Sequence, residues 1–119
     1  MTRDDVIEIY DRLIAAHPDL KRKGAKSAYT ALNGNMFSFV DAAGLLAIRL
    51  SKEDKADYNA THDPDPVIQY NATMNGYVKV TPALLANEAA LADWFAKSVD
   101  FGRNLPPKPT RKTPKKSAK

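Results

Sequence analysis

The sequence contains no cysteine, which excludes disulfide bonds, thiolate metal sites and cysteine nucleophiles. It also has no apolar run of the roughly 18 residues that a membrane-spanning helix needs. Residues 1–5 are polar and acidic, whereas a secretory signal has a basic segment followed by an apolar one. The sequence therefore predicts a cytoplasmic protein without a membrane partner.

Patterns typical of catalysis are also missing. There is no Gly-x-Ser-x-Gly elbow and no glycine-rich phosphate loop, and neither His17 nor His62 has a nucleophile at a telling spacing. Residues 62–65 (His-Asp-Pro-Asp) place three potential metal ligands together, but there is no second cluster to complete a site. We interpret this segment as a polar loop and predict no enzyme activity, no cofactor and no metal site.

Charge is distributed very unevenly along the 119 residues. Residues 105–119 hold six of the 18 basic residues and none of the 14 acidic ones, which gives this tail a charge of +6. Residues 1–104 hold the other 12 basic residues and all 14 acidic ones, a net charge of −2. The tail is rich in proline, lysine, threonine and serine and has no apolar periodicity, which is typical of disorder. We therefore expect a folded domain over residues 1–104 and a disordered basic tail over residues 105–119.

Helical periodicity begins directly after Thr2, a good N-cap, and predicts a helix over residues 3–16. Ser51 can cap a second, short helix that runs to about Asn59. Residues 61–66 contain two prolines, and we expect no regular structure there.

Two further helix starts lie near the end of the domain. Thr81-Pro82 places proline at the first helical position, and Asn87 can cap a final helix over residues 88–101. Gly102 is a fitting stop for that helix. The inward stripe that we expect on it consists of Leu91, Trp94, Phe95, Ser98 and Val99.

Alternating patterns predict strands between these helices. A short strand can begin at Tyr29, and residues 36–40 and 45–50 read as an antiparallel hairpin. Residues 67–70 and 76–80 read as a second strand pair. This order of elements predicts the α+β class: an antiparallel sheet of about five strands with helices packed on one face.

Strand alternation also predicts the two faces of the sheet. The face under the helices is expected to carry Phe37, Phe39, Leu46, Ile48, Leu50, Ile68, Tyr70, Val78 and Val80. The opposite, wetter face is expected to carry Ser38, Arg49, Gln69, Tyr77 and Lys79.

Several strand and turn segments are similar to those of one known family. These segments are Met36-Phe37, residues 44–54, residues 76–82, Leu84-Leu85 and Trp94. Over roughly residues 3–108 the chain resembles the TfoX N-terminal domain family. The resemblance implies a compact α+β domain of bacterial type, and it implies no known reaction and no catalytic residues.

The basic tail is the feature that points most directly to a partner. Its cations are Lys108, Arg111, Lys112, Lys115, Lys116 and Lys119. Extended, proline-stiffened cations can follow a row of phosphates and release their counterions, which predicts contact with nucleic acid. Residues 113–116 (Thr-Pro-Lys-Lys) are similar to the repeat of linker-histone tails, and residues 21–26 form a second basic segment. The alternatives are a purely solubilising tail and attraction to an anionic membrane.

The folded domain offers a further candidate surface for a protein partner or a second copy of the chain. Arg49, Tyr77 and Lys79 share the face that we expect to be open. A competing hypothesis is a small-molecule binding protein or an unrecognised enzyme. Its site would lie where the loop over residues 62–66 meets this open face.

Overall fold

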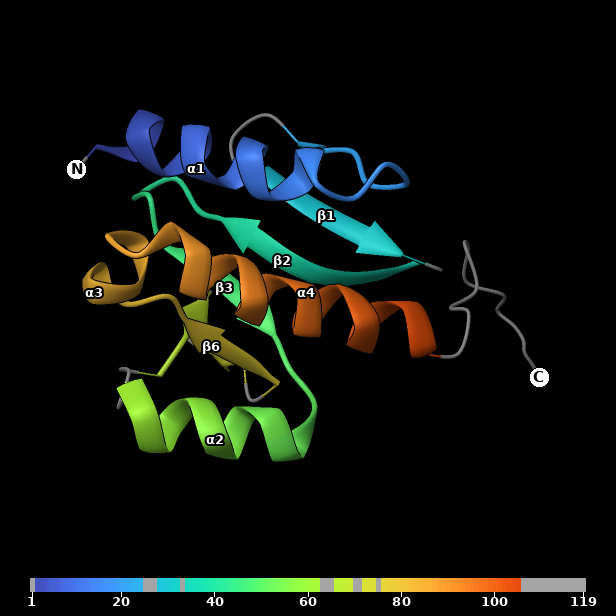
Figure 1. The fold of residues 1–119 in the computed structure, drawn as a ribbon, viewed down its shortest axis with the longest axis vertical. Coiled ribbons are helices and arrows are strands. Elements are labelled where there is room, and N and C mark those ends of the chain that lie inside the picture. Colours follow the sequence, from blue (N-terminus) through green and yellow to red (C-terminus); the bar gives the residue numbers. More distant parts are fainter. Residues whose placement is uncertain are drawn as a thin grey trace.

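The computed structural model describes residues 2–24, 28–32, 34–62, 66–69, 72–74 and 76–105. Helices and antiparallel sheets alternate along the chain (Figure 1), so the predicted α+β class is confirmed. The helices are α1 (Arg3–Ala15), α2 (Lys52–His62), α3 (Pro82–Leu85) and α4 (Glu88–Asn104). The strands are β1 (Ala28–Leu32), β2 (Asn35–Val40), β3 (Leu46–Arg49), β4 (Ile68–Gln69), β5 (Ala72–Thr73) and β6 (Tyr77–Lys79).

The main sheet has four strands in the order β1-β2-β3-β6, rather than about five, and every neighbouring pair is antiparallel. The expected pairing of residues 67–70 with residues 76–80 is wrong. β6 instead pairs with β3, with Ile48 opposite Val78, and β4 pairs with β5 in a separate two-stranded sheet. The reason is that Val78 on β6 and Val80 directly after it belong to the main buried core, whereas β4 is only two residues long.

The helices lie along one side of the main sheet (Figure 1). α4 crosses its middle and contacts β1, β2 and β3, while α2 runs beside the edge strand β6. The Tyr58 hydroxyl of α2 donates a hydrogen bond to the Lys79 carbonyl at 2.7 Å. This bond occupies an acceptor on the edge of β6, where an open backbone would invite pairing with another chain.

A β-bulge in β2 changes which side chains face the helices. Thr30 pairs with Ser38 but Ala31 pairs with Met36, so Phe37 is an extra residue in β2. Phe37 and Ser38 therefore both lie on the helix side and are fully buried. The expected exposure of Ser38 and the expected place of Phe39 under the helices are both wrong, because alternation restarts after the bulge.

Ser38 belongs to a buried hydroxyl cluster beneath α1. The Tyr10 hydroxyl lies 2.7 Å from the Ser38 hydroxyl and 3.3 Å from that of Thr30, and those two hydroxyls also bond to each other. Burial raises the pKa of Tyr10 to about 12. Tyr10 also meets Phe95 of α4 edge to face, with ring centroids 6.2 Å apart. The cluster thus joins α1, the sheet and α4 without leaving its polar groups unpaired.

The helix ends agree with the sequence prediction where a side chain close in sequence caps the helix. Thr2 and Asp5 form a reciprocal capping box on α1. α2, however, continues to His62, so residues 61 and 62 are helical against expectation, and residues 63–65 lie outside the described residues. α4 likewise runs through Gly102 to Asn104. A Cβ at Gly102 would lie 3.0 Å from Phe37 Cδ1, so this glycine allows close packing of α4 on the sheet instead of ending the helix.

Candidate functional site

The three residues predicted to form a partner surface do lie on adjacent strands. Arg49 pairs with Tyr77 across β3 and β6, and Lys79 lies two residues further along β6. Arg49 and Lys79 are half-buried, but Tyr77 is only 9% exposed. The Tyr77 hydroxyl donates to the Met36 carbonyl at 2.8 Å, and burial raises the pKa of Tyr77 to about 12. The Tyr77 ring is therefore a packing group and is not available to stack on a ligand.

The expectation of an open, wet face around Tyr77 is wrong because the β4–β5 segment packs over it. Phe39, Ala47, Val67 and Tyr77 form a second buried apolar cluster there. Val67 is 1% exposed, and its carbonyl accepts a hydrogen bond from the Met74 amide at 2.8 Å. No sequence signal identifies this cover, since each of its strands has only two residues.

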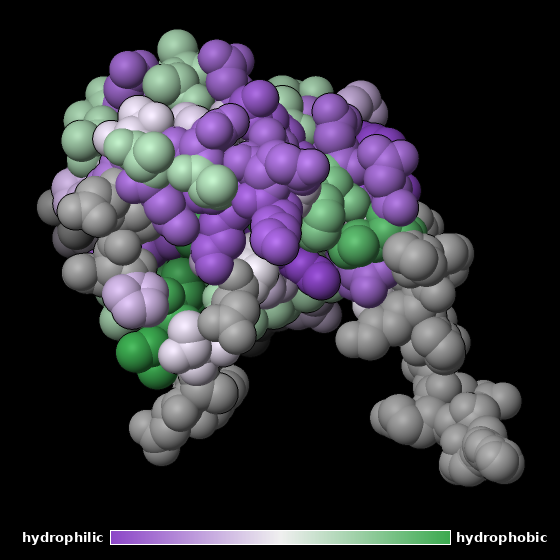
Figure 2. Space-filling view, turned by 90° about the horizontal axis from the view of Figure 1, so that it is seen from below, coloured by the Kyte–Doolittle hydropathy of each residue, from purple (hydrophilic) through white to green (hydrophobic). Residues whose placement is uncertain are grey.

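Hydrophilic side chains cover most of the face on which α2 lies, and hydrophobic ones occupy small separate areas of it (Figure 2). Among the described residues, Ile68 on β4 is the only large hydrophobic side chain that is exposed, at 55%. A single exposed apolar residue is ordinary for a protein surface. This face therefore does not present a broad apolar interface.

The region of the competing small-molecule hypothesis begins at His62, the last residue of α2. The His62 ring lies 4.7 Å from the Tyr58 ring and 6.1 Å from the Trp94 ring, centroid to centroid. The Lys97 ammonium group lies 5.8 Å from the Trp94 centroid on the same side of α4. The aromatic cluster thus holds His62 by packing. Within the described part of the chain, no group of three or more His, Asp or Glu side chains could hold a metal ion.

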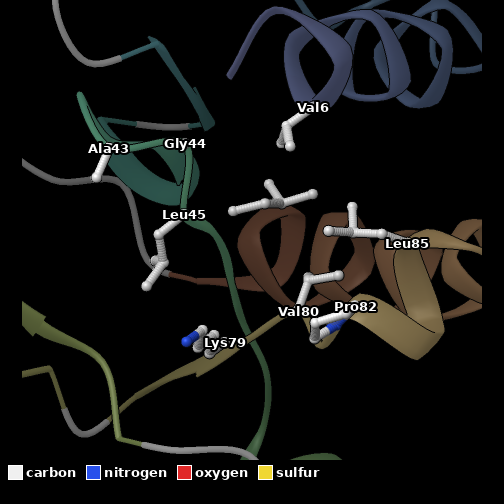
Figure 3. Close-up of a pocket in the computed structure, with 9 residues that line it drawn as sticks. Val6, Ala43, Gly44, Leu45, Lys79, Val80, Pro82 and Leu85 are labelled. Carbon is white, nitrogen blue, oxygen red and sulfur yellow. The ribbon is translucent and has the colours of Figure 1, made fainter. Parts of the chain in front are cut away.

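A pocket of about 510 Å³ lies elsewhere, between α1, the β2–β3 turn, β6 and α3 (Figure 3). Its walls are aliphatic, with Val6, Val80 and Leu85 among them, and Lys79 is the one titratable residue among the described residues that line it. A second pocket of about 250 Å³ lies between α1 and α4, where Arg12 and Glu88 form an ion pair at 2.8 Å. Among the described residues, no serine, threonine or cysteine lines either pocket, so these residues do not combine a hydroxyl or thiol nucleophile with a base.

Residues 20–24, the described part of the chain between the basic segment's start and β1, have a defined backbone. Leu20 is 7% exposed and anchors the loop in the core, and its amide donates to the His17 carbonyl at 3.0 Å. Lys23 and Tyr29 exchange two backbone hydrogen bonds of 2.8 and 2.9 Å, as in an antiparallel strand pair. The loop therefore presents the exposed side chains of Lys21, Arg22 and Lys23 from fixed positions.

This loop meets the last turn of α4. The Arg103 guanidinium donates to both oxygens of the Asp19 carboxylate, and this hydrogen bonding lowers the pKa of Asp19. Both side chains are 45% exposed, so the pair adds little stability. Its consequence is positional, since it connects the last turn of α4 to the α1–β1 loop, and both lie on the same side of the molecule in Figure 1.

The tail cations Lys108, Arg111, Lys112, Lys115, Lys116 and Lys119 lie outside the described residues, as does Lys26 of the loop. The structure nevertheless fixes where the chain enters the tail. The ion pair between Arg103 and Asp19 joins the last turn of α4, just before that point, to the loop that carries the second basic segment, 84 residues earlier in the sequence. Sequence reasoning found both segments and could not tell that they share one end of the molecule.

No protein-family model matches this sequence, and no curated protein matches it. Within the described residues, no helix combines the length and the apolar character needed to cross a bilayer.

Proposed function

We propose that this protein is a non-enzymatic, cytoplasmic accessory domain that contacts nucleic acid through its basic tail, residues 105–119. The observation that carries the proposal is the charge division of +6 on the tail against −2 on residues 1–104. The folded part would bind a protein partner or a second copy of the chain, as the resemblance to a small TfoX-like domain suggests.

The physical basis is the release of counterions from phosphates. Each neutralised phosphate of duplex DNA contributes about 0.9 to the slope of log affinity against log salt, so six contacts give a slope of about −5 at most. Such contacts are independent of sequence and position the protein without reading bases.

Two features of the fold support this role. The tail begins at the end of α4 that adjoins the basic α1–β1 loop, so cations from distant parts of the sequence can act on one partner. In addition, the described residues that line the two pockets include no serine, threonine or cysteine that could act as a nucleophile.

The test measures duplex DNA binding by the full chain across a salt series. A variant with all six tail cations changed to glutamine should lose binding, and residues 1–104 alone should behave in the same way. A matched variant with the order of residues 106–119 scrambled keeps the charge and should bind like the original. Equal binding by the full chain and by residues 1–104 would refute the proposal, as would no binding by the full chain at low salt.

A further inference from the structure

The α1–β1 loop carries two lysines whose charge is not used within the described fold. The Arg22 Nε atom lies 2.7 Å from Asp11 Oδ1, and Arg103 pairs with Asp19, so each nearby aspartate has an arginine partner. Among the residues that the structure describes, neither Lys21 nor Lys23 has its ammonium group in an ion pair, and both side chains are exposed. Their charges are therefore available to an external anion.

The positions of these lysines are held by the backbone. Leu20 buries its side chain directly before Lys21, and the two hydrogen bonds to Tyr29 fix Lys23. An ordered backbone reduces the conformational entropy lost when the loop binds a partner. Only the lysine side chains then have to be ordered.

The charge around the loop favours an anion over a cation. The charged groups on and next to the loop include Lys21, Arg22, Lys23 and Arg103 against Asp11, Asp19 and Asp100, and Asp100 also acts on Arg103. These groups give four positive against three negative charges, an excess of one before the tail is counted. A weak local excess cannot bind phosphate strongly alone, so its contribution depends on the tail.

The ion pair between Asp19 and Arg103 places the loop beside the start of the tail. Once the tail holds a nucleic acid, the loop meets the same molecule at a high effective concentration, because the two contacts belong to one chain. A weak contact can then add to the observed affinity.

We propose that Lys21 and Lys23 form a second phosphate contact for duplex nucleic acid, which holds the bound duplex against the α1–β1 end of the domain. This inference rests on the proposed function of the tail. It adds an orientation, since the surfaces of α2 and of the β4–β5 segment would then face away from the duplex.

The test uses the full chain and a random-sequence DNA duplex, with affinity measured from low to moderate salt. The double variant Lys21→Ala/Lys23→Ala should reduce the magnitude of the log–log salt slope by about 2, since each lost phosphate contact removes about 0.9. On the same basis, if the double variant and the original have equal affinities extrapolated to about 1 M salt, the variant should bind about 60-fold more weakly at about 0.1 M salt. The matched control is Lys52→Ala/Lys97→Ala, two exposed lysines on α2 and α4 that should leave the slope unchanged.

Unchanged melting temperatures would show that both variants fold. Amide chemical shifts provide a second measurement, in which DNA should perturb residues 20–24 and leave α2 unaffected. If the full chain binds but the loop and control variants have the same slope, the loop inference is wrong and the tail proposal stands. If the full chain does not bind at low salt, the tail proposal is wrong and the loop inference fails with it.

Discussion

Replacing Tyr10 with phenylalanine should change how the stability of the domain depends on alkaline pH. The ring packing against Phe95 is kept, and only the hydroxyl bonded to Ser38 and Thr30 is removed. Ser38 and Thr30 still bond to each other, so neither is left without a partner. At about pH 8 the variant should lose about 1 kcal/mol of unfolding free energy, the usual value of one buried hydrogen bond.

Loss of the Tyr10 proton at alkaline pH works in the opposite direction, because it lowers the stability of the original protein and not that of the variant. Burial raises the pKa of Tyr10 from 10.0 to about 12 in the folded protein. Between these values the folded protein retains a proton that the unfolded chain has lost. The stabilisation is therefore complete below pH 10 and is lost as pH rises towards 12, by about 1.4 kcal/mol per unit and about 3 kcal/mol in all.

The variant has no such proton at position 10. Its initial deficit of about 1 kcal/mol should therefore shrink above pH 10, and the two stability curves should cross near about pH 11. Lysines and the remaining tyrosines, including Tyr77 with its raised pKa, titrate in both proteins and largely cancel in the comparison.

The assay is urea unfolding of both proteins at about pH 8, 9, 10 and 11, with tyrosinate absorbance recorded in parallel. A difference in stability that stays constant from about pH 8 to 11 would refute the reasoning. It would mean that the Tyr10 hydroxyl titrates alike in the folded and unfolded chains, which is incompatible with its burial.

Two further predictions concern packing. Gly102→Val should destabilise the domain by about 1–3 kcal/mol in thermal unfolding, because a Cβ at this position meets Phe37 Cδ1 at 3.0 Å. Gly102→Ala should destabilise it less, because the higher helix propensity of alanine offsets part of the cost of that contact. A more stable Gly102→Val variant would contradict this close approach. Val67→Ala should cost about 2 kcal/mol while its neighbour Ile68→Ala stays within about 0.5 kcal/mol, because Val67 is 1% exposed and Ile68 is 55% exposed. Equal effects in urea unfolding would show that the β4–β5 segment does not cover the sheet.

The elements that the sequence predicted best are those defined by neighbouring residues. The capping side chains of Thr2, Thr81 and Asn87 accept backbone hydrogen bonds at the starts of α1, α3 and α4. Gly34 and Gly44 have φ values of 79° and 92° in the turns on either side of β2. Caps and turns form within about four residues, so local chemistry is sufficient to specify them.

Apart from the end of α2, the predictions that failed depended on packing between distant segments. Alternation placed Phe39 with Phe37, but the bulge separates them onto opposite faces of the sheet. Glycine commonly ends helices, so Gly102 was predicted to end the last one. The nearby Phe37 ring shows instead that Gly102 allows α4 to pack closely on the sheet. A local pattern cannot reveal an extra residue or a partner that lies more than sixty residues away.

The candidate nucleic-acid interface likewise has features that the sequence determined and features that only the tertiary structure decided. The sequence by itself determined that residues 105–119 are basic and that the charge of residues 1–104 is slightly negative, because charge is a property of composition. Only the tertiary structure decided that the α1–β1 loop adjoins the end of α4, through Asp19 and Arg103, and that the β4–β5 segment covers Tyr77. These contacts join residues far apart in sequence, and they form because the apolar faces of α1, α4 and the sheet must be buried together.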